Sequence, residues 1–370
     1  AGCSRAQKLP ALRPVIAPAQ RLNELPEDDV WRLQHDYLRM VEEAGKMPGN
    51  VITDCSPLTV YPYASRLLSE PSGERFEQLL YRADLLKKLF DVHIYLPPEL
   101  PLVDDGFRPI SETMRKEIDQ HIFNSLEGIP FYVVSGDLQR RAALTKKILE
   151  GTATEHERFI SFEGLPGSGK TTQIAILQKT LCQLGVDVHV CQRYPDIKKH
   201  DKVRTLYEDP IKNRDELLTY HKQAFMDQYE RNRVEERLAD GQLVISDRHK
   251  FTIIAMQMAL GAQVGDIYES LADLPSPGRV LLFDIDPTVA ISRRRASSES
   301  TSIKLDYEFQ QRVTVAYRWL LAHHIEFEPV NANRTETHVA RDVMRLLGYD
   351  FSFNVAVDVV SDVMKQYPLT

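Results

Sequence analysis

Short apolar runs alternate with longer segments of helical periodicity in the second half of the chain. Apolar runs that predict buried strands lie at residues 186–191, 241–249, 279–284 and 325–330. Between and after them, apolar residues recur at helical spacing over residues 214–240, 306–322 and 336–347. Strands that alternate with helices form parallel sheets with helices on both faces. We therefore predict an α/β fold for residues 151–348.

The first 150 residues follow a different pattern. A helix is predicted over residues 28–44, where Val30, Leu33, Leu38 and Val41 share one side. Short strands are predicted around residues 49–56, 92–96 and 130–135, and a basic helix follows from Leu138. The chain then divides into a basic arm (1–23), an α/β domain (24–150), a second α/β domain (151–348) and a tail (349–370).

The strongest chemical signal is a glycine-rich loop between a strand and a helix. Residues 164–171 read GLPGSGKT and fit the pattern G-x-x-x-x-G-K-[ST]. An apolar strand at residues 159–162 precedes this loop, and apolar residues at helical spacing follow it from Thr172. This context is the one that a nucleotide-binding P-loop needs, which places the second domain among P-loop NTPase-type folds.

Each residue type in this loop has a physical role in binding the phosphates of ATP. Glycines let successive backbone N–H groups point at phosphate oxygens, and the helix N-terminus adds positive potential. Lys170 reaches the β- and γ-phosphates, and the Thr171 hydroxyl is a ligand for Mg²⁺. The predicted nucleotide-binding residues are Gly164, Gly167, Ser168, Gly169, Lys170, Thr171 and Thr172.

Five segments together resemble the thymidylate kinase family. They are FEGLPGSGKTTQ, RYPD, LVISDRH, LLFDIDP and EFQQRVTVAYRWL, in the order and at the spacings of that family, over residues 156–348. The resemblance implies an ATP- and Mg²⁺-dependent kinase that phosphorylates dTMP or a related pyrimidine nucleotide. It also implies a nucleotide substrate as the partner, with a homodimer as the common assembly.

The resemblance implies roles for residues outside the P-loop. Asp247 would hold the hydrated Mg²⁺ with Thr171, and Arg248 would reach the acceptor phosphate. Arg193 would clamp that phosphate, while Tyr194 would shape the acceptor pocket. Arg294, with its neighbours Arg293 and Arg295, would supply charge to the transition state. Two structural alternatives stay open: a buried Asp247–Arg248 ion pair, and a solvated helix face for the arginine run.

Three departures from the family pattern support a second interpretation. Pro166 stands where many members carry an acid, and Asp227 falls where the family places a substrate-contacting arginine. Residues 296–302 are rich in serine where the family is charged. The alternative is therefore a catalytically degenerate accessory subunit of a larger assembly that retains bound nucleotide, with protein partners instead of turnover.

The first half resembles a nucleoside kinase of the nicotinamide-riboside-kinase type. VITDCSPLTVY and YLPPELPLVDDGFR carry this resemblance, but Cys55 replaces the arginine that follows the strand-end acid Asp54. No G-x-x-x-x-G-K-[ST] pattern occurs before residue 164. Either a P-loop half lies upstream of Ala1, or this domain is degenerate, which we favour. Asp54, Arg108 and Arg115 are then scaffold residues, and the chain carries two kinase-like domains in tandem.

Composition narrows the classes of partner and compartment. The chain has 370 residues, a formal net charge of −7 and four cysteines without a C-x-x-C pair. This balance disfavours a broad surface for duplex nucleic acid, and the cysteines favour a reducing compartment. The longest apolar runs are far too short for a membrane span. An arginine-rich, acid-free start at residues 1–23 leaves both the cytoplasm and the mitochondrial matrix open.

Overall fold

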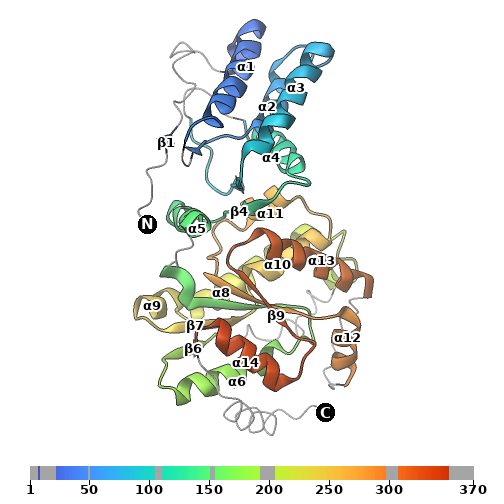
Figure 1. The fold of residues 1–370 in the computed structure, drawn as a ribbon. Coiled ribbons are helices and arrows are strands. Elements are labelled where there is room, and N and C mark those ends of the chain that lie inside the picture. The colour runs from blue at the N-terminus through green and yellow to red at the C-terminus, as the bar shows by residue number, and fades with distance from the viewer. Residues whose placement is uncertain are drawn as a thin grey trace. The chain divides into compact units, whose positions relative to one another are not determined.

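A computed structural model describes residues 7–8, 22–48, 51–104, 111–150, 155–191, 205–296 and 307–349. The chain divides into an N-terminal unit, residues 1–133, and a C-terminal unit, residues 134–370 (Figure 1). Several predicted features lie outside the described residues: most of the basic arm, Arg108, Arg193, Tyr194, the serine-rich segment from residue 297, and the tail from residue 350.

A parallel five-stranded sheet forms the centre of the C-terminal unit. The strands are β5 (Phe159–Gly164), β6 (Val188–Val190), β7 (Leu243–Asp247), β8 (Arg279–Asp284) and β9 (Phe327–Asn331), in the order β6-β7-β5-β8-β9. Every neighbouring pair is parallel. All six residues of β5 are buried, as expected for a central strand covered on both faces. The predicted α/β fold is confirmed.

Helices cover both faces of this sheet (Figure 1). On one side α6 (Lys170–Gln183) packs against α14 (Glu336–Leu346). On the other side α10 (Lys250–Ala259) packs against α8 (Arg214–Arg231) and α13 (Tyr307–His323). The other helices of the C-terminal unit include α9 (Val234–Ala239), α11 (Val264–Ser270) and α12 (Pro287–Ala296).

Two helical features differ from the sequence prediction. The single helix expected over residues 214–240 is two helices, because the chain turns at Arg233, which has a left-handed φ of 50°. The α10 helix was absent from the prediction because almost all of its residues are buried, including Phe251 and Ile254. A helix that is apolar all round lacks the one-sided periodicity by which amphipathic helices are identified.

The helix α5 (Leu138–Glu150) belongs to the C-terminal unit, so the division falls at Val134 and not at the expected residue 150. Arg140 connects α5 to the segments that directly precede β8 and β9. Its guanidinium donates to the carbonyl oxygen of Pro277 over 3.0 Å and to Glu326 Oε1 over 3.0 Å. Both side chains of this ion pair are buried.

The Arg140–Glu326 pair continues into a buried polar network. His324 Nδ1 lies 3.3 Å from Glu326 Oε1, and the Tyr268 hydroxyl lies 2.6 Å from His324 Nε2. Burial alone would raise the pKa of Glu326, but the adjacent His324 and Arg140 outweigh it and hold that pKa at about 2. The carboxylate therefore stays charged inside the protein, and its stability depends on these partners.

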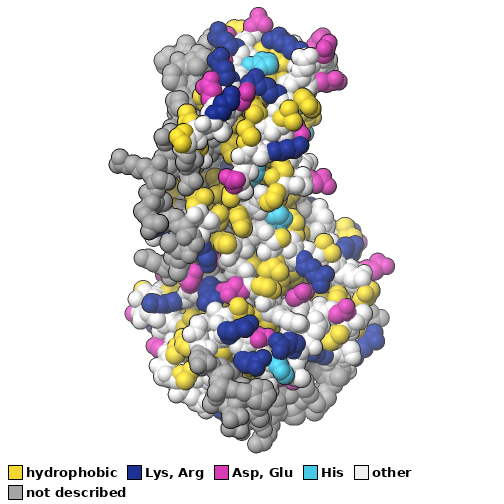
Figure 2. Space-filling view, viewed as in Figure 1, with side chains coloured by type: hydrophobic (Ala, Val, Ile, Leu, Met, Phe, Trp, Pro, Cys, Tyr) yellow, Lys and Arg dark blue, Asp and Glu magenta, His cyan; other side chains and the backbone are white. Residues whose placement is uncertain are grey.

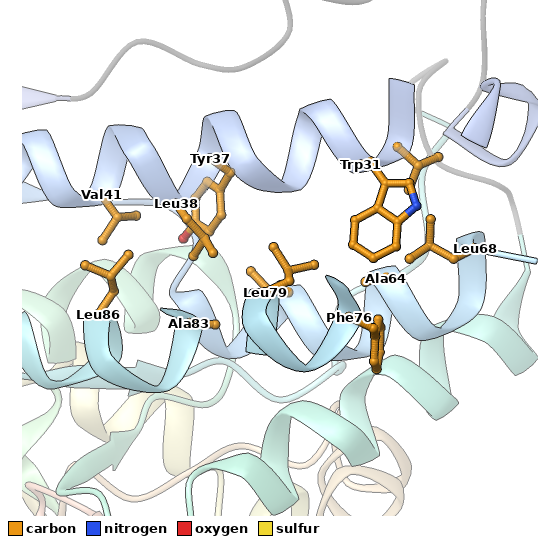
Figure 3. Close-up of a cluster of buried hydrophobic side chains, with 12 residues drawn as sticks. Trp31, Tyr37, Leu38, Val41, Ala64, Leu68, Phe76, Leu79, Ala83 and Leu86 are labelled. Carbon is orange, nitrogen blue, oxygen red and sulfur yellow. The ribbon is translucent and has the colours of Figure 1, made fainter. Parts of the chain in front are cut away.

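The N-terminal unit contains α1 (Glu27–Ala44), α2 (Val60–Leu67), α3 (Glu74–Leu86) and α4 (Glu112–Ser125). Figure 3 shows the core between the first three of these helices, with Leu38 from α1 facing Leu79 from α3. Trp31 closes one end of this core, and the Arg75 guanidinium lies 4.2 Å from its ring centroid. The buried one-sided pattern predicted for residues 28–44 is confirmed.

The predicted strands of the N-terminal unit form, but not as one sheet. Two separate parallel pairs join β1 (Gln7–Lys8) to β2 (Val51–Ile52), and β3 (His93–Tyr95) to β4 (Phe131–Val133). Arg115 donates to the Leu100 carbonyl over 2.7 Å, as a scaffold residue does, and Asp54 is exposed. The resemblance of this unit to a nucleoside kinase stays a prediction.

The face in Figure 2 carries Lys and Arg side chains interspersed with Asp and Glu. This mixture accords with the net charge of −7. In the described part of the chain no helix is long and apolar enough to cross a membrane.

Candidate nucleotide-binding site

The glycine-rich loop joins the carboxyl end of β5 to the N-terminus of α6. Gly167 and Gly169 have φ angles of 86° and 88°, a left-handed conformation that costs little only for glycine. The Ser168 N–H donates to the Leu165 carbonyl over 3.2 Å and tightens the turn. This backbone curls around the start of α6, where unpaired N–H groups and the helix dipole attract an anion.

Lys170 lies folded against this loop. Its Nζ donates to the carbonyl oxygens of Gly164 (3.2 Å) and Leu165 (2.8 Å), and to Ser168 Oγ (2.9 Å). The side chain is buried, so its positive charge lies inside the loop that is predicted to receive phosphate. The sequence assignment of Lys170 to the P-loop therefore agrees with the geometry.

Thr171 and Asp247 come from different elements and meet at the same edge of the sheet. The Thr171 hydroxyl at the start of α6 donates to Asp247 Oδ2 over 2.8 Å. Asp247 ends β7, the strand beside β5, and pairs in register with Phe162. A hydroxyl and a carboxylate are hard oxygen donors of the kind that Mg²⁺ prefers. They fit a magnesium site completed by nucleotide phosphates and water.

Arg248 follows Asp247 in a constrained backbone conformation. Its φ is 75°, which is uncommon for a residue with a side chain. The Arg248 N–H donates to the Phe162 carbonyl over 3.1 Å, and Ser246 Oγ donates to the Arg248 carbonyl over 2.7 Å. These bonds bind the turn to β5. Asp247 accepts a hydrogen bond from the Thr171 hydroxyl, whereas Arg248 Nη1 donates to Thr252 Oγ1.

The three arginines of α12 have different environments. Arg294 lies over the P-loop, since a β-carbon built on Gly167 would lie 2.9 Å from Arg294 Cγ. Arg293 donates to the Ala332 carbonyl over 2.9 Å and so binds α12 to the loop after β9. Arg295 is exposed. The structure therefore separates Arg294, beside the phosphate-binding loop, from two neighbours that lie elsewhere.

Comparison with known proteins agrees with this arrangement. Residues 162–343 match the thymidylate kinase family. The thymidylate kinase of Pseudoalteromonas translucida is 30% identical over 202 residues, which are 51% of this chain and 95% of that protein. The thymidylate kinase of Vibrio parahaemolyticus is 31% identical over 201 residues, or 51% of this chain and 94% of its own length.

This chain belongs to the thymidylate kinase family. Its membership rests on the C-terminal unit, since the matches cover about half of the chain. Among solved structures, a deoxyadenosine kinase from M. mycoides with bound dATP aligns with a TM-score of 0.40 and 17% identity, over 51% of this chain and 98% of that one.

Asp227 occupies the position at which the family resemblance places a substrate-contacting arginine. In this member of the thymidylate kinase family it accepts a hydrogen bond from Gln223 over 2.7 Å and lies 3.9 Å from Arg231 on the same helix. The neighbouring Arg233 forms an ion pair with Glu236. Arg231 and Arg233 thus each lie beside an acid of α8 or α9.

A second layer of polar side chains behind Arg248 was absent from the sequence prediction. Glu163, Thr252 and Tyr317 come from β5, α10 and α13, and they form a buried hydrogen-bonded cluster. Arg248 Nη1 donates to Thr252 Oγ1 over 3.3 Å. In the sequence, the only indication of this cluster was Glu163 itself, an acidic residue directly before the glycine-rich loop. Its partners lie too far along the chain to be associated by pattern.

A tyrosine and a histidine form another pair near Arg248. The Tyr207 hydroxyl lies 2.7 Å from His221 Nε2. Burial and, to a smaller extent, the positive charge of Arg248 lower the pKa of His221 to about 4. The imidazole is therefore neutral at physiological pH.

Within the described residues no group of three or more His, Cys, Asp and Glu could hold a metal ion alone.

Proposed function

We propose that this chain is an ATP- and Mg²⁺-dependent nucleoside monophosphate kinase, which converts dTMP or a related pyrimidine nucleotide to its diphosphate and releases ADP. The observation that carries the proposal is the 2.8 Å hydrogen bond from Thr171 to Asp247 at the mouth of the loop that surrounds Lys170. Together these residues provide a cation, a metal-binding hydroxyl and a metal-binding carboxylate in one place.

Phosphoryl transfer requires positioning and charge compensation more than covalent chemistry. Lys170 already lies inside the loop, held by carbonyl oxygens of Gly164 and Leu165. On binding ATP its ammonium group would exchange these carbonyls for phosphate oxygens, with little reorganisation. A bound Mg²⁺ would neutralise charge on the β- and γ-phosphates, with Thr171 and Asp247 as the protein groups that hold it.

Two arginines approach the P-loop from different sides. Arg248, in the strained turn after β7, would bind the acceptor phosphate, and Arg294 lies over Gly167 from α12. Guanidinium groups bind phosphate oxygens in forked pairs of hydrogen bonds, so these residues can align the acceptor and stabilise the charge of the transferring group. Arg193 and Tyr194 would complete the acceptor site.

The identity of the acceptor base depends on positions at which this chain departs from the family pattern. Gln223 and Asp227 bond to each other on α8, so an arginine contact to the base is missing at that position. The neutral Tyr207–His221 pair offers hydrogen bonds of a different kind nearby. The acceptor panel must therefore extend beyond dTMP to the other pyrimidine nucleotides and nucleosides.

A coupled ADP-release assay tests the function. Full-length protein with Mg²⁺-ATP is assayed against a panel of deoxynucleosides and nucleoside monophosphates. We expect turnover with a pyrimidine monophosphate, and its loss in Lys170→Ala. Lys212→Ala is a matched control, because it removes the same charge from an exposed position of the C-terminal unit. It should retain the rate of the unaltered protein.

The alternative function, an accessory subunit that keeps nucleotide without turning it over, predicts a different outcome. ATP binding measured by calorimetry would survive and would depend on Lys170, yet no acceptor would be consumed. Under that outcome the kinase proposal fails, and the N-terminal unit becomes the first place to search for protein partners.

A further inference from the structure

Glu163 is a fully buried acid that phosphate binding by the P-loop does not use. It is the next-to-last residue of β5 and is wholly shielded from solvent. Its Oε1 accepts the His249 N–H over 2.8 Å. Its Oε2 accepts the hydroxyl of Thr252, and also that of Tyr317 over 3.1 Å. An ionised carboxylate in the protein interior is costly, so three donors directed at this one are a built arrangement.

The direction of these hydrogen bonds follows from counting protons. The Thr252 hydroxyl has one proton, which it donates to Glu163, leaving its lone pairs toward Arg248. Arg248 Nη1 donates to that oxygen over 3.3 Å. Tyr317 also donates to Glu163 and lies 3.1 Å from Thr252 Oγ1. A hydrogen-bonded chain therefore runs from the Arg248 guanidinium through the Thr252 hydroxyl to the Glu163 carboxyl group.

Glu163 also lies next to the P-loop, which is proposed to bind the phosphates of ATP. The residue after it is Gly164, whose carbonyl oxygen accepts a hydrogen bond from Lys170 Nζ. One peptide unit thus separates the group that supports Arg248 from the group that holds the P-loop lysine. Burial raises the pKa of Glu163 above its usual range, and its hydrogen-bond donors and the charge of Arg248 offset only part of that rise.

The Arg248 guanidinium needs a contact of its own, because the backbone does not fix the direction of the side chain. Its left-handed φ of 75° is held by hydrogen bonds to Phe162 and Ser246, which fix where the side chain begins. A long arginine side chain has several rotatable bonds, so the guanidinium needs a second fixed point to hold one direction. The contact that provides this point is the hydrogen bond from Arg248 Nη1 to Thr252 Oγ1.

We propose that Glu163, acting through the Thr252 hydroxyl, is a positioning residue that directs the Arg248 guanidinium toward the acceptor phosphate. This inference rests on the proposed kinase function and assigns acceptor binding and donor binding to different residues. Thr252 and Glu163 affect acceptor binding and transfer, whereas donor binding depends on the P-loop.

Thr252→Val is the decisive variant, because valine keeps the branched shape and removes the hydroxyl. We expect the KM for the monophosphate acceptor to rise about tenfold, the size expected for a lost hydrogen bond to a charged group. The KM for ATP should stay within about twofold, because the P-loop is unchanged. Thr252→Ser returns the hydroxyl and should restore most of the acceptor affinity. Glu163→Gln, which replaces one acceptor oxygen with an N–H donor, should repeat the Thr252→Val pattern.

A matched control separates positioning from general damage. Thr314 is as buried as Thr252, but its hydroxyl donates to the Gln310 carbonyl within α13. Thr314→Val should therefore leave the ratio of the two KM values unchanged. If Thr252→Val raises both KM values equally, or neither, or if serine does not rescue it, the inference is wrong while the kinase function stands.

Direct binding distinguishes this failure from failure of the proposed function. Calorimetric titration of each protein with dTMP and with the acceptor found in the panel gives a Kd that does not depend on turnover. Weaker binding to Thr252→Val than to the unaltered protein supports the inference. Equal binding contradicts it alone. If the unaltered protein neither binds nor phosphorylates any monophosphate, the proposed function fails and the inference fails with it.

Discussion

A β-carbon at position 167 would lie 2.3 Å from the carbonyl oxygen of Ala290, so Gly167 and α12 are in direct backbone contact. Because Arg294 is one turn further along α12, this contact also determines how far that arginine stands from the P-loop. The glycine therefore serves two purposes: it adopts a left-handed φ, and it leaves space for the helix that carries Arg294.

We predict that Gly167→Ala impairs nucleotide binding much more than Gly169→Ala does. Both positions have nearly the same left-handed φ, and strain there costs an alanine about 1–2 kcal/mol. A β-carbon at Gly169 meets nothing within 4 Å, whereas at Gly167 it displaces α12. Titration of each variant with ATP by calorimetry measures the difference. Equal losses of affinity would show that strain alone, and not the contact with α12, decides the outcome.

Removing Arg140 should strongly destabilise the C-terminal unit. Arg140→Ala leaves Glu326 buried without its main ion-pair partner, which typically costs about 3–5 kcal/mol. Urea denaturation followed by circular dichroism gives the free energy of unfolding. Lys147→Ala is the control, since its 2.9 Å ion pair with Glu157 is half-exposed and should contribute less than about 1 kcal/mol.

A double variant tests whether the unpaired Glu326 carboxylate causes the loss of stability in Arg140→Ala. In Arg140→Met with Glu326→Leu, no unpaired carboxylate remains, so the free energy of unfolding should recover part of what Arg140→Ala lost. A double variant as unstable as the single one would instead attribute the loss to the packing of α5.

The free energy of unfolding should fall as the pH is lowered from about 6.5 toward 4. Burial lowers the pKa of His221 to about 4 and that of His249 to about 3, with Arg248 and Lys250 respectively adding to the effect. In the unfolded chain both histidines titrate near 6.5, so between these values the unfolded state binds more protons. The expected slope is about 2–3 kcal/mol per pH unit around pH 5 for two protons.

A single variant tests the assignment of this slope. His249 is surrounded by Phe159, Phe225 and Tyr229, and neither ring nitrogen has a hydrogen-bond partner among the described residues. His249→Phe removes one of the two protons, so the slope of stability against pH should decrease by about half. An unchanged slope would mean that other groups govern the acid sensitivity.

Weakening the core of the N-terminal unit should leave nucleotide binding intact. Leu79 is fully buried within the cluster of Figure 3, so Leu79→Ala should cost about 2–5 kcal/mol. Tyr81 on the same helix is 68% exposed, and Tyr81→Ala should change stability by less than about 1 kcal/mol. Thermal denaturation measures the first effect, and the Kd for ATP should be the same for both variants.

Loss of ATP affinity in Leu79→Ala, at a temperature where it is folded, would contradict this prediction. It would mean that the two compact units do not function independently.

The sequence identified the parts of the site that are contiguous along the chain. The P-loop from Gly164 to Thr171 could be predicted because strand, turn and helix residues follow each other directly. Asp247 and Arg248 were expected from the resemblance to the thymidylate kinase family, and the structure places Asp247 at the end of β7, in register with Phe162 of β5. For the P-loop itself the local pattern was sufficient.

The support behind Arg248 could not be predicted in this way. Glu163, Thr252 and Tyr317 are separated by 89 and 65 residues, and only packing of α10 and α13 brings them together. The break at Arg233 was missed because its φ of 50° is uncommon for a residue with a side chain, so the local pattern does not predict it.

The buried pair of Arg140 and Glu326 has a consequence for how this chain can be shortened. Glu326 belongs to the segment shared with thymidylate kinases, whereas Arg140 lies before it. A fragment that kept only the shared segment would retain this carboxylate in its interior without the guanidinium. An expression fragment of the C-terminal unit should therefore begin before α5, and not at the start of the family match.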